Sequence, residues 1–241
     1  MSIITLYDIA STHPGQAWSP NTAKARQGIP HKTVFLEYPE IEPLCKKLGA
    51  KPTSQTSLQY TLPVIYDPST DAVVSNSIEI AQYLDATYPN TPRLIPEGTA
   101  AFHYAFTEAF EATLPPLLVY TLPASLPFLN SASQDYFRRT REELFGGRRL
   151  EDVTPTGDEH AVMWKRLEDA FGTTDGWIRK NGADSKYFMG DTLCYADISV
   201  AGWLRWAKMV LGKDKWESIL TWHDGRWASL MKELEKYNIV F

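Results

Sequence analysis

Short, apolar, β-branched runs alternate with helix-like segments over the first 88 residues, and few folds accommodate that order. The predicted strands cover residues 3–9, 33–38, 62–66 and 72–74. Three helices are predicted. The first begins at Ser19, the second covers residues 43–49 and the third covers residues 77–88. The resulting order, β-α-β-α-β-β-α, predicts a mixed sheet with helices packed on it.

Local signals support these boundaries. Ser19 suits the cap of the first helix, and Pro20 suits its first turn, where the missing N–H group costs nothing. Gly49 stands where the second helix should end. Residues 67–71 have a hairpin-turn sequence, and residues 10–17 have the composition of a loop.

The pattern changes after residue 88. Residues 89–97 contain three prolines and are predicted to be a linker. Helical patterns then cover residues 100–114, 134–145, 159–181, 198–211 and 227–237. Four prolines in residues 115–127 should break or end the first of these helices. The sequence therefore predicts an α/β domain over 1–88 and an all-helical domain over 98–241.

Composition limits the class of protein. The chain has 241 residues, is 44% hydrophobic and carries a net charge of -5, which suits a solvated globular protein. It has no basic block typical of nucleic-acid binding, no signal-peptide pattern and no apolar run of membrane-spanning length. Two distant cysteines form neither a CxxC motif nor a metal cluster. We expect a cytoplasmic protein with no metal, nucleic-acid or membrane partner.

Three short motifs carry a family resemblance. They are Trp18-Ser19-Pro20-Asn21-Thr22, Tyr60-Thr61-Leu62-Pro63-Val64-Ile65-Tyr66-Asp67-Pro68, and Ser75-Asn76-Ser77 followed by Ile80-Ala81-Gln82-Tyr83-Leu84. With them, nearly the whole chain resembles the cytosolic glutathione transferases, and most closely the fungal etherase-like (FuA) class, which resembles bacterial lignin β-etherases. The resemblance implies a thioredoxin-like N-terminal domain, glutathione as co-substrate, a homodimer and a hydrophobic aromatic acceptor.

The chain departs from the family pattern at three positions. Asn76 stands where the family usually has an acidic residue, which should weaken pairing with the glutathione ammonium. Ala23 stands where the class more often has Trp. Cys194 replaces a capping Ser or Thr before Tyr195-Ala196-Asp197-Ile198, and a thiol is a weak hydrogen-bonding group. We expect the helix that follows to be capped less well, by about 1 kcal/mol.

Ser19 and Asn21 are the candidate catalytic residues. A free thiol with a pKa of about 8.5 is mostly protonated at neutral pH. A hydroxyl and N–H donors at a helix start would stabilise the glutathione thiolate. The alternative is that Ser19 only caps the helix. Competing donors are Ser11, Thr12 and Tyr7.

The resemblance also implies the glutathione-binding residues. Pro63 would follow a cis peptide bond, so that the Leu62 backbone pairs with the cysteinyl backbone of glutathione; an ordinary trans proline is the alternative. Ser77 would bind the γ-glutamyl carboxylate at a helix start, flanked by Asn76, although a capping role alone is also open. Further candidates are Gln59 and Thr61 for the peptide, and Lys47 or Lys51 for the glycine carboxylate.

The acceptor site should lie between the two domains. Four aromatic residues are candidates for its lining, although helix-spaced aromatics are more often core: Phe102, Phe106, Phe110 and Tyr120. The content of eight tryptophans, twelve tyrosines and ten phenylalanines suits a protein that handles flat hydrophobic compounds.

Three functions compete. The first is a glutathione transferase or glutathione-dependent etherase, and the second is a non-catalytic, ligandin-type binder of polyphenols or a regulatory protein on the same fold. The third, a thioredoxin-like reductase, is disfavoured because no cysteine precedes Cys45 to serve as the nucleophile.

Overall fold

The computed structural model describes residues 3–13, 15, 17–26, 30–54 and 59–235. Its N-terminal part contains a four-stranded mixed sheet in the order β2-β1-β3-β4. The strands are β1 (Ile4–Ile9), β2 (His31–Leu36), β3 (Val64–Asp67) and β4 (Ala72–Ser75). β1 and β2 run parallel, whereas β3 is antiparallel to both β1 and β4. The predicted thioredoxin-like sheet is therefore present.

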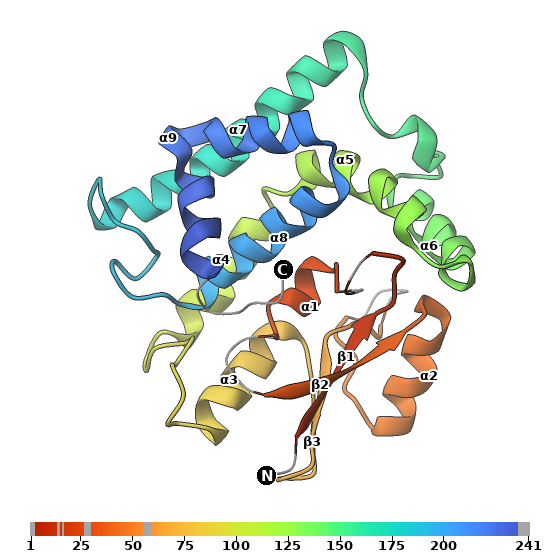
Figure 1. Cartoon of the computed structure of the whole chain (residues 1–241), viewed down its shortest axis with the longest axis vertical. Helices are drawn as coiled ribbons and strands as arrows, with labels where there is room; N and C mark the ends of the chain where they lie inside the picture. The colour runs from red at the N-terminus through yellow and green to blue at the C-terminus, as the bar shows by residue number, and fades with distance from the viewer. Residues whose placement is uncertain (1–2, 14, 16, 27–29, 55–58, 236–241) are drawn as a thin grey trace.

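Three helices accompany the sheet: α1 (Pro20–Ala23), α2 (Tyr38–Leu48) and α3 (Ser77–Thr87). Figure 1 shows α2 on one side of the sheet and α3 on the other. The prediction that α2 starts at residue 43 was wrong, because Glu37 and Glu40 cap it reciprocally and start it at Tyr38. Gly49 ends α2 in the left-handed conformation, as predicted.

The rest of the chain is helical (Figure 1). The helices are α4 (Ala100–Glu111), α5 (Pro115–Ser125), α6 (Ser131–Leu144), α7 (Gly157–Ile178), α8 (Tyr195–Val210) and α9 (Lys213–Glu235). Short 3-10 turns are η1 (Leu126–Phe128), η2 (Leu150–Asp152) and η3 (Arg179–Asn181). α9 has a non-helical break at residues 222–225. The helix predicted over 227–237 corresponds to its second part, and residues 236 and 237 lie outside the described residues. Among the described residues, we find no helix with both the length and the apolarity that a membrane span requires.

Helix α5 was not predicted. The prolines do end α4, but Pro115 starts a new helix, in whose first turn an N–H group is not needed. Pro123 lies inside α5 and cannot donate to the carbonyl of Val119. That carbonyl accepts a hydrogen bond from Thr154 Oγ1 at 3.0 Å instead. A contact from a distant segment therefore satisfies the group that the proline leaves unpaired.

Helix α8 joins the two halves of the molecule. Fourteen of its sixteen residues are buried, and α1 packs directly against it. Gly202 permits this approach, because a Cβ atom there would lie 2.7 Å from the Pro20 carbonyl oxygen. Arg205, also on α8, donates to the Ala17 carbonyl at 2.6 Å. The segment that carries Ser19 is thus fixed by the helical half.

Cys194 precedes α8 at its N-cap, as predicted. Asp197 accepts from the Cys194 N–H group at 2.9 Å and from its thiol at 3.1 Å. The other carboxylate oxygen accepts from the Phe188 N–H group at 3.0 Å. Asp197 is fully buried, so it ties the preceding loop to the helix start. The lower capping energy expected for Cys194 stays a prediction.

Candidate functional site

Ser19 lies at the N-cap of α1 and is buried. Its Oγ accepts from the Thr22 N–H group at 3.5 Å, which is long for a hydrogen bond to an N–H donor. The capping function therefore leaves the hydroxyl proton available to another acceptor. Because α1 spans four residues, a helix dipole contributes less to anion binding here than the hydroxyl and the local N–H groups do.

Asn21 is oriented by a buried ammonium group. Lys24 Nζ donates to Asn21 Oδ1 at 3.0 Å and lies 3.3 Å from Glu111 Oε1. Burial lowers the pKa of Lys24, and the Glu111 carboxylate opposes that shift. Since the amide oxygen of Asn21 is occupied by Lys24, its Nδ2 hydrogens are the part of the side chain left to donate to a ligand.

A cavity of about 220 Å³ opens beside these two residues. Ser19 and Asn21 line it together with Thr61 and Leu62. Seven aromatic side chains form much of the remaining wall: Trp18, Tyr38, Tyr60, Tyr136, Phe137, Trp203 and Trp206. They come from the α1 region, the neighbourhood of α2 and β3, and helices α6 and α8. Both halves of the chain therefore build one cavity.

The Leu62–Pro63 peptide bond is cis, as the sequence predicted. Leu62 and Pro63 precede β3, which starts two residues later than expected. No described residue forms a hydrogen bond with the Leu62 backbone. Within the described part of the chain, its N–H and C=O groups are thus left to pair with an extended peptide.

The Asn76-Ser77 pair lies next to Pro63. The Asn76 N–H group donates to the Pro63 carbonyl at 3.3 Å. Asn76 has a φ of 75° and caps α3 through a bond from the Ile78 N–H group at 3.2 Å. The Ser77 hydroxyl lies 2.8 Å from the hydroxyl of Tyr195 at the start of α8. The structure thus brings the two predicted binding segments together, although Ser77 lies outside the lining of the cavity.

Gln59 and Thr61 are linked through Thr53. The Thr53 N–H group donates to the Gln59 carbonyl at 2.8 Å, and the Thr53 and Thr61 hydroxyls lie 2.8 Å apart. Gln59 and Lys51 line a second, open depression. Lys47 is exposed and does not line it. Of the two lysines considered for the glycine carboxylate, Lys51 is the one beside Gln59.

The four aromatics predicted for the acceptor site do not line the cavity. Phe102 is 75% exposed, and Phe106 stacks on the buried Phe110 with ring centroids 5.6 Å apart. Tyr120 is buried and its hydroxyl lies 3.0 Å from His160 Nδ1. Helical spacing identified aromatics of α4 and α5, but tertiary packing places α4 away from the cavity and brings Leu118 and Leu122 of α5 to its wall. Trp203 and Trp206 of α8 do line the cavity, and their spacing of three residues on one helix was the sequence signal that could have identified them.

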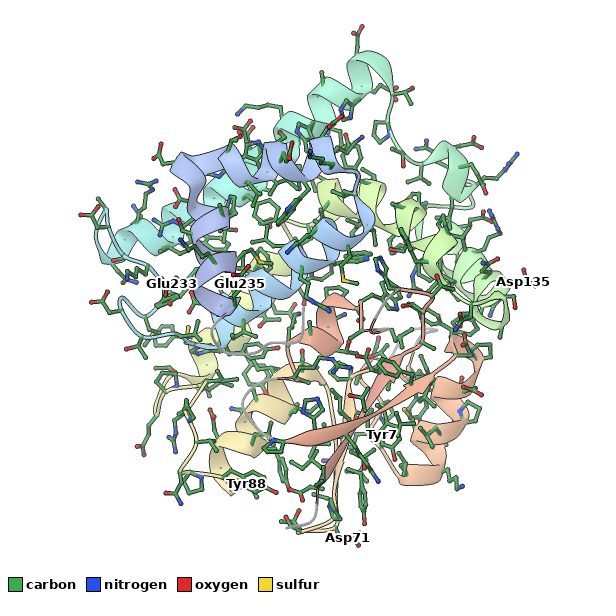
Figure 2. The ribbon with its side chains drawn as sticks, viewed as in Figure 1. Tyr7, Asp71, Tyr88, Asp135, Glu233 and Glu235 are labelled. Carbon is green, nitrogen blue, oxygen red and sulfur yellow. The ribbon has the colours of Figure 1, made fainter. Side chains whose placement is uncertain are left out.

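The competing donors also lie outside the cavity. The Ser11 hydroxyl accepts from the His13 N–H group, and the Thr12 hydroxyl donates to the Phe128 carbonyl. Tyr7 lies on β1, within the sheet (Figure 2). The described residues contain no group of three His, Cys, Asp or Glu side chains that could hold a metal ion.

Comparison with known proteins agrees with this geometry. Residues 101–237 match the family model described as glutathione S-transferase, C-terminal domain. The glutathione S-transferase-like protein ustS of Aspergillus flavus is 30% identical over 249 residues, covering 95% of this chain and 88% of the relative. The chain belongs to the glutathione S-transferase family.

Comparison with solved structures identifies the class within this family. A glutathione S-transferase of Ceriporiopsis subvermispora, crystallised with glutathione, has 46% identity and a TM-score of 0.92, with 99% of each chain covered. Glutathione transferase GSTFuA3 of Phanerochaete chrysosporium has 37% identity and a TM-score of 0.92, covering 100% of this chain and 99% of that one. The protein is a glutathione transferase of the fungal FuA type.

Proposed function

We propose that the protein uses glutathione to attack hydrophobic aromatic electrophiles, including lignin-like aryl ethers. The glutathione thiolate forms a carbon–sulfur bond, and the leaving group departs with its bonding electrons as a halide or a phenolate. The observation that carries the proposal is the shared cavity, in which Ser19, Asn21 and Leu62 face the same space as seven aromatic side chains. Aromatic walls favour a flat second substrate.

Ser19 and Asn21 are proposed to stabilise the thiolate. The Ser19 hydroxyl donates to the sulfur, and the Asn21 amide, oriented by Lys24, supplies a second donor. A hydrogen bond to an ionised group is stronger than a neutral one and favours the anion. This lowers the thiol pKa of bound glutathione and raises the thiolate fraction at neutral pH.

Glutathione itself would lie along the cis-proline segment. The free backbone groups of Leu62 pair with its cysteinyl unit, and Asn76 and Ser77 hold the γ-glutamyl group. Gln59 and Thr61 contact the peptide, and Lys51 faces the glycine carboxylate. Two Ceriporiopsis subvermispora relatives were crystallised in complex with glutathione, which supports glutathione as the ligand.

A ligandin-type binder is the second candidate, because an aromatic cavity also suits polyphenols that are not turned over. Turnover of 1-chloro-2,4-dinitrobenzene and of a β-aryl ether ketone should separate the two, alongside displacement of a hydrophobic dye. Conjugation or ether cleavage that depends on both enzyme and glutathione supports the transferase proposal. Dye displacement by polyphenols without turnover of either compound contradicts it. The homodimer and the cytoplasmic location stay predictions.

Replacement of Ser77 should weaken glutathione binding. Ser77→Ala removes a hydroxyl from a charged ligand, which predicts about tenfold weaker binding, or roughly 1.4 kcal/mol. Ser75→Ala is the matched control, because the Ser75 hydroxyl has no hydrogen-bond partner among the described residues. Calorimetry on both variants measures the effect. Equal affinity of Ser77→Ala and the parent protein would remove Ser77 from the glutathione site.

A further inference from the structure

The wall of the cavity has one charged side chain among the residues that the structure describes. Among the described residues that line it, Arg141 of α6 is charged, and no Asp, Glu, Lys or His side chain contributes to the wall. The remainder is aromatic, aliphatic or hydroxyl-bearing. A lone guanidinium beside aromatic rings is a recognition group for an anion, because its planar N–H donors match carboxylate geometry.

Arg141 has no carboxylate partner in the described part of the chain. Its guanidinium lies 4.9 Å from the ring centroid of Phe137 and 5.6 Å from that of Tyr38. Nη1 donates to Thr140 Oγ1 at 3.0 Å. Burial raises the pKa of Tyr38, and the positive charge of Arg141 opposes that shift. These contacts hold the cation against the aromatic wall without neutralising it.

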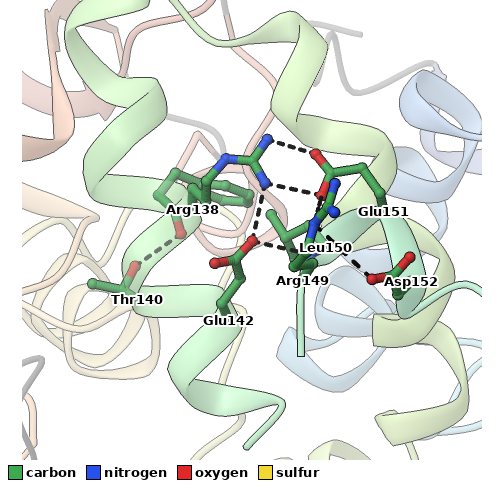
Figure 3. Close-up of polar contacts among 8 residues, drawn as sticks. Arg138, Thr140, Glu142, Arg149, Leu150, Glu151 and Asp152 are labelled. Carbon is green, nitrogen blue, oxygen red and sulfur yellow. Dashed lines mark hydrogen bonds and ion pairs between the residues drawn. The ribbon is translucent and has the colours of Figure 1, made fainter. Parts of the chain in front are cut away.

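Arg138, one turn earlier on α6, has different partners. Arg138 forms ion pairs with Glu142 at 2.9 Å and Glu151 at 2.6 Å (Figure 3). Arg149 also lies near carboxylates, at 3.6 Å from Glu151. Glu142 and Glu151 are therefore paired with Arg138, and no ion pair of Arg141 is present among the described residues.

The walls are also rich in donors. Ser19, Asn21 and Thr61 line the cavity and carry hydroxyl or amide donors, whereas no carboxylate lines it among the described residues. Such a lining favours a ligand that brings oxygen acceptors, and disfavours a cationic one.

We propose that the second substrate is an aromatic carboxylate and that Arg141 binds its carboxylate group. The proposal rests on the function assigned to this cavity above. The aromatic ring stacks within the walls, and the guanidinium fixes its orientation relative to the sulfur held by Ser19. Arg141 is then the residue that determines whether the cavity prefers a charged or a neutral second substrate.

The test compares two ligands of nearly equal shape, 2-naphthoate and its neutral amide 2-naphthamide. Calorimetry is performed on protein saturated with S-methylglutathione, which occupies the peptide site and cannot react. The parent protein should bind naphthoate about tenfold more tightly than naphthamide, as expected for a charge-assisted hydrogen bond. Arg141→Gln should abolish that preference and change naphthamide affinity less than about twofold, which also shows that the variant is folded.

Arg149→Gln is the matched control, because it removes an exposed arginine of the same region that does not line the cavity. It should leave the preference for naphthoate intact. Equal affinities in the parent protein, including no binding of either compound, overturn the proposal, and so does a preference that survives in Arg141→Gln. Weaker glutathione binding in Arg141→Gln with unchanged naphthoate binding would assign the arginine to the glycine carboxylate instead. Binding requires no turnover, so a failure here is distinguishable from a failure of the proposed activity.

Discussion

Turnover should fall by a factor of about ten to one hundred when Ser19 is replaced by alanine, because a hydrogen bond to a thiolate is worth roughly 1.5–3 kcal/mol. Glutathione affinity should stay nearly unchanged, since the Leu62 backbone and Ser77 anchors are intact. The capping bond that is lost is long, at 3.5 Å, so the effect on stability should be small. Selective loss of turnover is thus the signature of thiolate stabilisation.

The decisive measurement is the thiolate absorbance of bound glutathione against pH. Ser19→Ala should raise the pKa of the bound thiol, and the pH dependence of turnover should shift to higher pH by the same amount. Ser11→Ala is the control, because that hydroxyl follows β1 but lies outside the cavity. If Ser19→Ala and the parent protein titrate alike, Asn21 or the local backbone N–H groups stabilise the anion, and Ser19 only caps α1.

Among the substitutions proposed for this protein, replacement of Asp197 should lower the free energy of unfolding most. Asp197→Ala removes the acceptor of the Cys194 and Phe188 N–H groups, and an unsatisfied buried donor costs about 1–3 kcal/mol. We expect a loss of roughly 2–4 kcal/mol in the free energy of unfolding. Urea unfolding measures it, with the exposed Asp191→Ala as the control. A loss no greater than that of Asp191→Ala would contradict the role of Asp197.

The same carboxyl group should make stability depend on pH. Burial raises the pKa of Asp197 from 3.8 to about 6. Between these values the native state binds a proton that the unfolded state has released, so stability should decrease as pH rises from about 4 to about 6 and then level off. The change is of order 3 kcal/mol, since one pKa unit corresponds to about 1.4 kcal/mol. Asp197→Asn should remove this part of the pH dependence, and an unchanged profile would contradict the assignment.

The sequence by itself determined the strands and helix ends that depend on residues close together in the chain. The alternation of apolar runs predicted the strands, Gly49 ended α2 as predicted, and the cis bond before Pro63 followed from the resemblance. The same motifs indicated Ser19 and Leu62, which the structure brings to one cavity. These features depend on conformational preferences and hydrogen bonds within a few residues, which a sequence pattern contains.

Tertiary structure decided what depends on distant partners. Helix α5 tolerates Pro123 because Thr154, from another segment, satisfies the Val119 carbonyl. The cavity wall combines rings from five separate segments, so helical spacing within one segment selected aromatics that do not line it. Arg141 differs from Arg138 only in which side chains surround it. Burial, pairing and charge at a site are properties of neighbours in space, and the order of residues along the chain does not specify those neighbours.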